Sequence, residues 1–165
     1  MTEQILKNRK IAILATDGFE RSELIKPKEA LEKAGADVQI VAIKTGAIRS
    51  WDKKDWGDTV DVDLIVSETT ADDFDALMLP GGVMSPDSLR INEEAVQFVR
   101  GFVLDSKPIA AICHGPWTLI EAGAVQGKRM TSWPSLKSDL ENAGAEGRYE
   151  ASQASRGVFE ESRLR

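Results

Sequence analysis

The sequence predicts a single α/β domain built on a mostly parallel β-sheet. Short apolar runs with the length of buried strands alternate with segments of helical spacing, an order typical of parallel sheets covered on both faces. The predicted strands are residues 11–15, 38–42, 76–80, 108–112 and 130–132. The predicted helices are residues 22–34, 92–104, 117–122 and 134–143. A chain of 165 residues is long enough to bury one sizeable core in this way.

The first half of the chain begins with a β-α-β unit. The first strand leads into the helix at 22–34, and Pro27 is expected in its early part, where a missing N–H costs least. Gly35 follows the helix as a stop signal. The strand at 38–42 completes the unit. Residues 44–75 are less regular, and their short alternating pieces suggest a hairpin.

The second half repeats the alternation. The strand at 76–80 ends at Gly81-Gly82, and Asn92 is a suitable N-cap for the following helix. Another buried strand breaks at Cys113, where a short helix begins soon afterwards. We expect the domain to occupy residues 1–146. The polar tail at 147–165 has few core candidates and is expected to be weakly ordered or a poor helix.

Composition and charge exclude several classes of protein. The formal net charge is -6, so nucleic acid is not expected as a main partner, because no basic excess exists to neutralise phosphates. A single cysteine excludes an intramolecular disulfide. No apolar run approaches the ~20 residues of a membrane span, and no signal sequence is evident. A cytoplasmic, reducing location is therefore expected, with no membrane partner.

Cys113, the only cysteine, is predicted to be a reactive thiol. It lies directly after a buried strand and before a helix, where the partial positive charge of a helix N-terminus favours thiolate. Gly115 leaves room for a sharp turn resembling a nucleophile elbow. The alternative is a buried structural cysteine, which is common among free cysteines.

Other candidate groups follow the predicted strands, whose carboxyl ends meet at one edge of the sheet. His114, the only histidine, could act as base or orienter, or lie at the surface. Gly81-Gly82 could supply an oxyanion N–H or form a plain turn. Glu20 and Glu23 could place a carboxyl with a raised pKa beside the thiol, or be solvated. One cysteine and one histidine do not indicate a metal site, and no cofactor is expected.

Three motifs together resemble the PfpI-type intracellular protease and deglycase family, within the Parkinsonism-associated-protein superfamily of class I glutamine amidotransferase-like folds. They are residues 15–24 (ATDGFERSEL), 79–82 (LPGG) and 110–116 (AAICHGP). Residues 129–134 and 139–145 are similar to the same family. The resemblance implies a flavodoxin-like three-layer sandwich and a cysteine on a strained elbow.

The resemblance also implies roles for individual residues. Cys113 matches the nucleophile, with His114 as its neighbour. Glu23 matches the carboxyl that contacts the thiol, with Glu20 close by. The N–H groups of Gly82 and His114 would form the oxyanion hole.

Further features of the resemblance concern assembly and specificity. Asp87, at the end of a loop from Gly82, matches an acidic residue that a neighbouring subunit presents to the histidine in protease-like members. A homodimer or larger homo-oligomer is therefore expected. Trp133 stands at a pocket position where other members have Tyr or His, which implies a different substrate choice. The tail at 147–165 differs from the usual C-terminal end of the family.

Three functions remain open from the sequence. The first is a cysteine-dependent stress-response hydrolase acting on a small carbonyl compound or a peptide, as a deglycase, glyoxalase or intracellular peptidase. The second is a non-catalytic oxidative-stress sensor or chaperone-like protein in which the same cysteine is oxidised. The third is a degenerate member that has lost activity together with its C-terminal end.

Overall fold

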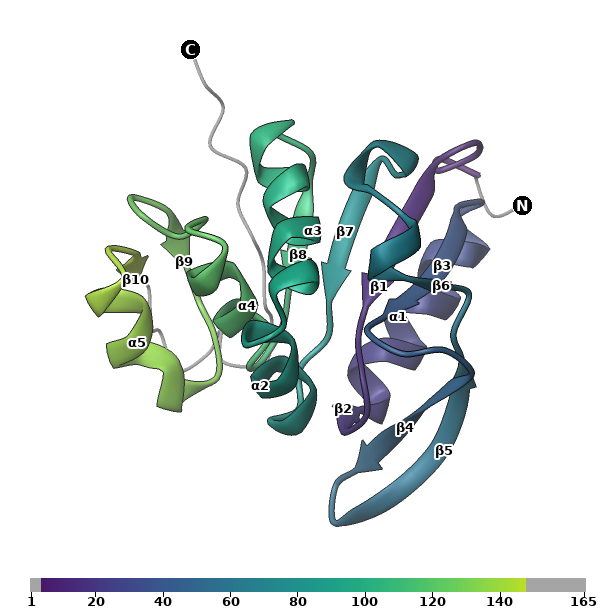
Figure 1. Cartoon of the computed structure of the whole chain (residues 1–165), viewed down its shortest axis with the longest axis horizontal. Coiled ribbons are helices and arrows are strands. Elements are labelled where there is room, and N and C mark those ends of the chain that lie inside the picture. Colours follow the sequence, from purple (N-terminus) through teal and green to yellow (C-terminus); the bar gives the residue numbers. More distant parts are fainter. Residues whose placement is uncertain (1–3, 148–165) are drawn as a thin grey trace.

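The computed structural model describes residues 4–147, and a five-stranded parallel sheet forms their centre. The strand order is β6-β3-β1-β7-β8 (Figure 1). These strands are β1 (Lys10–Leu14), β3 (Asp37–Ala42), β6 (Leu64–Ile65), β7 (Ala76–Leu79) and β8 (Ile109–Ala111). The sequence-based prediction of a mostly parallel α/β sheet is confirmed, and β6 is an additional short edge strand.

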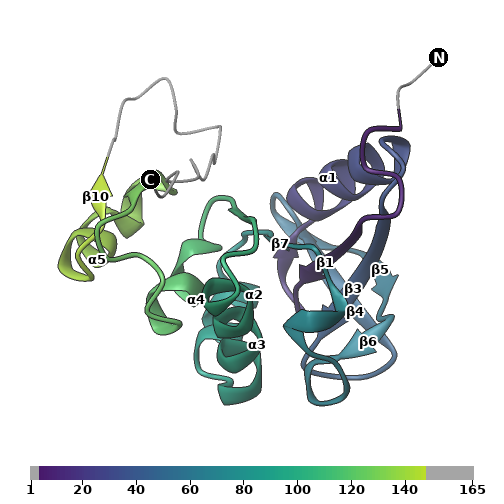
Figure 2. The ribbon, with the colours of Figure 1, turned by 90° about the horizontal axis from the view of Figure 1, so that it is seen from above.

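Two apolar clusters cover the two faces of the sheet, because neighbouring residues of a strand point to opposite sides. On one face, Ile13 packs with Leu24 of α1 (Arg21–Lys33). On the other, Leu14 belongs to a cluster with Phe98 and Phe102 of α3 (Glu93–Leu104). Figure 2 shows α1 on one side of the strands, and α2 (Met84–Arg90), α3 and α4 (Pro116–Glu121) together on the other. This arrangement is the predicted three-layer sandwich.

Helix α1 differs from the prediction in one respect. It begins at Arg21, so Pro27 lies in its interior and not in its early part. Because proline has no N–H, the carbonyl of Glu23, four residues earlier, loses its helical partner. The tolerance of Pro27 reflects the packing of the helix on the sheet through the fully buried Leu24.

The predicted hairpin is present between β3 and β7. It consists of β4 (Ala47–Asp52) and β5 (Asp55–Asp61), and it extends from the lower edge of the sheet in Figure 1. Strand β2 (Phe19–Glu20) pairs in parallel with β4 and ties the hairpin to the segment after β1. Two 3₁₀ turns, η1 (Val66–Glu68) and η2 (Ala71–Asp73), then lead to β7.

One helix was not predicted from the sequence. Residues expected as a loop after Gly82 form α2 (Met84–Arg90), so Asp87 lies on a helix. Pro86 is compatible with it, because the first turn of a helix has no internal partner for its N–H groups. The predicted cap of the next helix is confirmed, since the Asn92 side chain accepts a hydrogen bond from the Ala95 N–H at 2.8 Å.

The last described elements extend the layer that contains α3, because Leu119, Met130 and Leu140 belong to the same apolar cluster as Phe102. Helix α4 (Pro116–Glu121) follows β8, and β9 (Arg129–Met130) pairs in parallel with β10 (Glu146–Gly147). The predicted helix at 134–143 is divided into a 3₁₀ turn, η3 (Pro134–Leu136), and α5 (Lys137–Asn142). The prediction for the tail concerns residues that, apart from Gly147, lie outside the described part of the chain.

Within residues 4–147, no helix has the length and apolar character that crossing a membrane requires.

Candidate functional site

The turn between β8 and α4 holds Cys113 in a left-handed backbone conformation, with φ at +58°. This conformation costs a residue with a side chain roughly 1–2 kcal/mol. Gly115 makes the turn possible, because a Cβ there would lie 2.6 Å from the carbonyl oxygen of Leu79. Its N–H donates to the Ile112 carbonyl at 2.8 Å, which closes the turn. The thiol therefore projects from a strained strand-to-helix elbow, as predicted.

The Gly81-Gly82 turn after β7 lies against this elbow. A Cβ on Gly81 would lie 2.5 Å from the Cβ of Cys113 and would also meet the carboxylate of Glu23. Gly82 has φ at +81°, which favours glycine, and its Cα approaches the carbonyl of Gly18. Neither position has room for a Cβ, because other parts of the chain pack directly against both glycines. The turn is therefore more than a plain chain reversal.

The Cys113 sulfur has partners on three sides. Its Sγ lies 3.2 Å from Nδ1 of His114 and shares a hydrogen bond with the carboxyl group of Glu23. The backbone N–H groups of Gly82 and His114 also point at the sulfur. Glu23 is held in place by Gly81, whose N–H donates to its Oε2 at 3.0 Å. The structure thus brings together five predicted positions that are up to 91 residues apart in the sequence.

The protonation of the thiol differs from the prediction. Burial, followed by the charge of Glu23, raises the pKa of Cys113 from its ordinary 9.0 to about 11, although the N–H groups of Gly82 and His114 oppose the rise. The expected thiolate at a helix N-terminus is therefore wrong for the resting site with Glu23 ionised. Helix α4 has only six residues, and the two largest causes acting on the thiol are desolvation and the charge of a neighbouring carboxylate.

The pKa of Glu23 is also raised, mainly by burial. The hydrogen bond from Gly81 opposes this rise, and the charge of Glu20 adds to it. Two acids in contact, each with a raised pKa, compete for protons, so their titrations are linked. Glu23 can consequently hold a proton at a pH where an exposed glutamate would have lost it.

His114 is buried among aromatic rings, with only 6% of its surface exposed. Its ring stacks on Trp133 at a centroid distance of 6.1 Å and meets the edge of Trp117 at 5.0 Å. Nε2 lies 3.3 Å from Oγ of Ser135. Burial lowers the pKa of His114, so the ring is neutral near pH 7 and can accept a proton.

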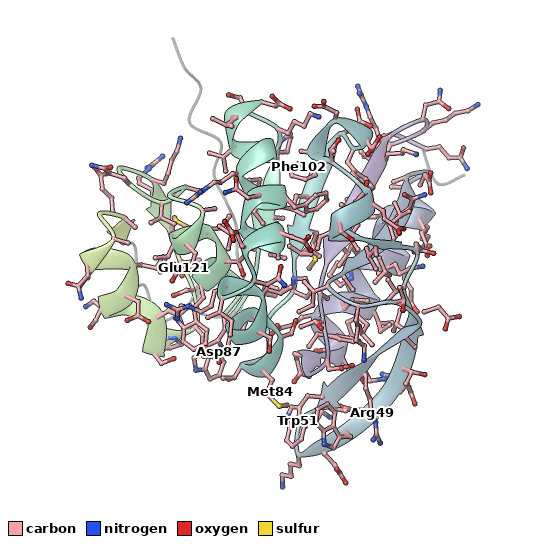
Figure 3. The ribbon with its side chains drawn as sticks, viewed as in Figure 1. Arg49, Trp51, Met84, Asp87, Phe102 and Glu121 are labelled. Atoms are coloured by element: carbon pink, nitrogen blue, oxygen red, sulfur yellow. The ribbon has the colours of Figure 1, made fainter. Side chains whose placement is uncertain are left out.

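The remaining predicted residues lie at different distances from the thiol. Glu20 donates its backbone N–H to the Gly81 carbonyl at 3.1 Å and acts on the sulfur only through Glu23. Trp133 borders the site and is 49% exposed. Asp87 is exposed on α2 (Figure 3), and the hydrogen-bond partner of His114 Nε2 within the described chain is Ser135.

Two residues that contact His114 were missed from the sequence. Ser135 contacts its Nε2, and Trp117 packs against its ring. The Trp117 indole N–H donates to Asp139 Oδ2 at 2.8 Å, and the guanidinium of Arg90 lies 5.2 Å from the centre of its ring. Trp117, four residues after Cys113, could have been found as an aromatic side chain on the first turn after the elbow. Nothing local in the sequence marks Ser135.

The described residues contain no group of three or more His, Cys, Asp or Glu side chains placed to hold a metal ion.

Comparison with known proteins agrees with this geometry. Residues 9–157 match the model of the DJ-1/PfpI family. A deglycase of Pyrococcus abyssi is 43% identical over 137 residues, covering 83% of this chain and 80% of its own. The protein/nucleic acid deglycase 2 of Escherichia coli is 42% identical over 139 residues, covering 84% and 79%.

A solved structure agrees as well. It is a two-domain protein of Anabaena variabilis with DJ-1/ThiJ/PfpI-like and ferritin-like domains, which superposes with a TM-score of 0.80 at 35% identity. The match covers 87% of this chain and 40% of that protein. The resemblance noted from the motifs is confirmed by both kinds of comparison, and the chain belongs to the DJ-1/PfpI family.

Proposed function

We propose that this protein is a cysteine-dependent hydrolase of the deglycase and glyoxalase type, with Cys113 as its nucleophile. The observation that carries the proposal is the left-handed Cys113 at the elbow, with its sulfur 3.2 Å from His114 Nδ1 and in contact with Glu23. A nucleophile, a base within hydrogen-bond reach and convergent N–H donors are the parts that addition to a carbonyl requires.

The chemistry can be written for an α-oxoaldehyde such as methylglyoxal. The sulfur of Cys113 bonds to the aldehyde carbon, and the thiol proton passes to Nδ1 of His114. The backbone N–H groups of Gly82 and His114 stabilise the oxyanion, which then takes up a proton to give a hemithioacetal. Glu23, with its raised pKa, moves a proton from that carbon to the neighbouring carbonyl carbon, while the hydroxyl proton passes to the neighbouring carbonyl oxygen, which leaves a thioester. Water hydrolyses the thioester to lactate and restores the thiol.

The later steps apply equally to an early glycation adduct. In such an adduct the aldehyde carbon carries a hydroxyl group and an amine. The sulfur bonds to that carbon as its bond to nitrogen breaks, and the thiol proton passes through His114 to the leaving amine, which gives the same hemithioacetal. Relatives at 42–43% identity are named deglycases, which supports this substrate class for the chain. The half-exposed Trp133 would line the pocket that admits the adduct.

Two companion expectations remain part of the proposal. The first is a homodimer or larger homo-oligomer, in which Asp87 of a neighbouring subunit would approach His114. Peptidase activity would need both that acid and a groove for the peptide. A cytoplasmic location would keep the single thiol reduced.

The second candidate, an oxidation sensor, is less well supported. Oxidation by peroxide proceeds through the thiolate, and a thiol with a pKa near 11 is almost entirely protonated at pH 7. A base beside a protonated thiol serves an enzyme, which generates thiolate only as it attacks.

The proposal is tested by measuring lactate and released amine. The purified chain is incubated with methylglyoxal alone and with methylglyoxal-treated N-acetyl-lysine, and both products are followed over time. We expect catalytic lactate formation that disappears in Cys113→Ser and persists in Ser138→Ala, a control at an exposed position of α5.

The comparison of the two substrates separates the two activities. A deglycase releases amine faster than the adduct dissociates spontaneously into amine and free methylglyoxal. A glyoxalase, which consumes only the free methylglyoxal, does not exceed that rate. Lactate formation equal in wild-type protein and Cys113→Ser would refute the proposed nucleophile.

A further inference from the structure

We propose that Ser135 is a positioning residue: its hydroxyl accepts a hydrogen bond from Nε2–H of His114 and thereby leaves the Nδ1 lone pair facing the Cys113 thiol. The inference deepens the proposed function and rests on it for its catalytic meaning. It also concerns the tautomer of His114 itself, which is measurable without any substrate.

The two ring nitrogens of His114 have different partners. Nδ1 lies 3.2 Å from Sγ of Cys113, and Nε2 lies 3.3 Å from Oγ of Ser135. A neutral imidazole carries one proton, so one nitrogen donates and the other accepts. Only the tautomer with hydrogen on Nε2 allows Nδ1 to take the proton of the thiol.

The surroundings of the thiol are compatible with this tautomer. The Cys113 thiol is the donor in its hydrogen bond with Glu23, and rotation of the S–H bond can turn the same hydrogen to Nδ1, 3.2 Å from the sulfur. The oxygens of Glu23 already accept from the N–H groups of Gly81 and Gly82, as well as interacting with the sulfur. Ser135 is exposed on its outer side, so its hydroxyl can accept from Nε2–H and donate to water.

The backbone around Ser135 fixes the position of its hydroxyl. The N–H of Trp133 donates to the carbonyl of Cys113 at 2.9 Å, which ties this segment directly to the elbow. The N–H of Leu136 donates to the Trp133 carbonyl at 3.0 Å, and the Leu136 side chain is fully buried. Ser135 therefore lies in a tight turn that is anchored on both sides.

The aromatic contacts fix the plane of the ring. Trp133 stacks on His114 with an interplanar angle of 26°, and Trp117 meets it at 64°. Trp117 is itself held by its hydrogen bond to Asp139 and by the guanidinium of Arg90. With the ring plane determined by packing, the hydroxyl of Ser135 determines which nitrogen carries the proton.

The experiment uses nitrogen-15 NMR of the full-length protein. His114 is the only histidine, so a long-range proton–nitrogen spectrum contains one pair of ring nitrogens and needs no assignment. At pH 7.5 we expect Nδ1 to be unprotonated and Nε2 to be protonated in wild-type protein. Ser135→Ala should shift both resonances toward the average of two tautomers, and Ser135→Thr, which keeps a hydroxyl, should restore the wild-type pattern.

The kinetic readout is the rate of Cys113 alkylation and, where turnover is present, kcat/KM over the pH range. We expect Ser135→Ala to lower kcat roughly three- to tenfold, the effect of losing one hydrogen bond of typical net strength. KM should be little changed, because Ser135 acts through His114. Ser138→Ala, three residues further along, should match wild-type protein in every measurement.

Three results would overturn the inference. One is an unchanged nitrogen spectrum in Ser135→Ala, and another is a wild-type spectrum with the proton on Nδ1. The third is a spectrum that changes in Asp87→Asn but not in Ser135→Ala, because the partner of Nε2 would then be the acid of a neighbouring subunit. Absence of turnover in wild-type protein with the expected nitrogen pattern would refute the proposed function and leave the role of Ser135 in place.

Discussion

The strongest test of the site is the replacement of Glu23 by Gln, which removes a charge beside Cys113 and keeps the shape of the side chain. The pKa of Cys113 is about 11 against an ordinary 9.0, with burial as the largest cause and the charge of Glu23 as the second. Removing the charge leaves burial in place, so we expect the pKa of Cys113 in Glu23→Gln to fall to about 10.

This change is large enough to measure by alkylation. At pH 8 a thiol with a pKa near 11 is about 0.1% thiolate, and one with a pKa near 10 is about 1%. The reaction of Cys113 with iodoacetamide should therefore be about tenfold faster in Glu23→Gln at that pH. The pH dependence of the rate gives both pKa values, and Cys113 is the only thiol in the chain.

The control is Glu20→Gln. The charge of Glu20 raises the pKa of Glu23 but is not a cause of the raised pKa of Cys113. This variant should leave the alkylation rate close to that of wild-type protein. The reasoning fails if the wild-type pKa of Cys113 lies below 9.0 and rises in Glu23→Gln. That result would mean that Glu23 holds the shared proton and that thiolate is the resting form.

Three further predictions concern stability, each measured by urea unfolding. Cys113→Gly should be more stable than Cys113→Ala by about 1 kcal/mol, because only glycine adopts the left-handed conformation without strain; equal stabilities would argue against strain at the elbow. Gly115→Ala should cost about 2 kcal/mol or more, since its Cβ would lie 2.6 Å from the Leu79 carbonyl, and a neutral effect would show that the turn can relax. Phe102→Ala should cost roughly 3–5 kcal/mol, because Phe102 is fully buried, whereas Leu104→Ala, at a position 83% exposed, should change little.

The central sheet and the elbow could be predicted because their signals are local. Each buried strand is a short apolar run, and Gly115 directly follows the residues that must turn sharply. Helix α2 could not be predicted in the same way. It has seven residues and contains Pro86, so its sequence resembles a loop, and its stability comes from packing of the buried Leu89.

The chemistry of the site was less predictable than its position. Cys113 meets Glu23 from 90 residues earlier and His114 meets Ser135 from 21 residues later, and neither distance along the chain carries a pattern. The expected thiolate was wrong for the same reason. The helix dipole is a local property that can be inferred from sequence, whereas burial and the charge of Glu23 arise only in the folded chain.

The protonation states of the site fit the proposed reaction, which starts from a protonated thiol. Burial disfavours the charged forms of Cys113, Glu23 and His114 alike, since it raises the pKa of both acids and lowers that of the base. The N–H groups of Gly82 and His114 are nevertheless directed at the sulfur, which would carry negative charge as it attacks in the proposed reaction. N–H donors that face little negative charge in the resting site and more in the transition state stabilise the transition state selectively. They therefore increase the rate and not merely the affinity. Burial therefore keeps Cys113 neutral in the resting site by raising the energy of its charged form, and in the proposed reaction the convergent N–H groups would lower the energy of the charged state that follows.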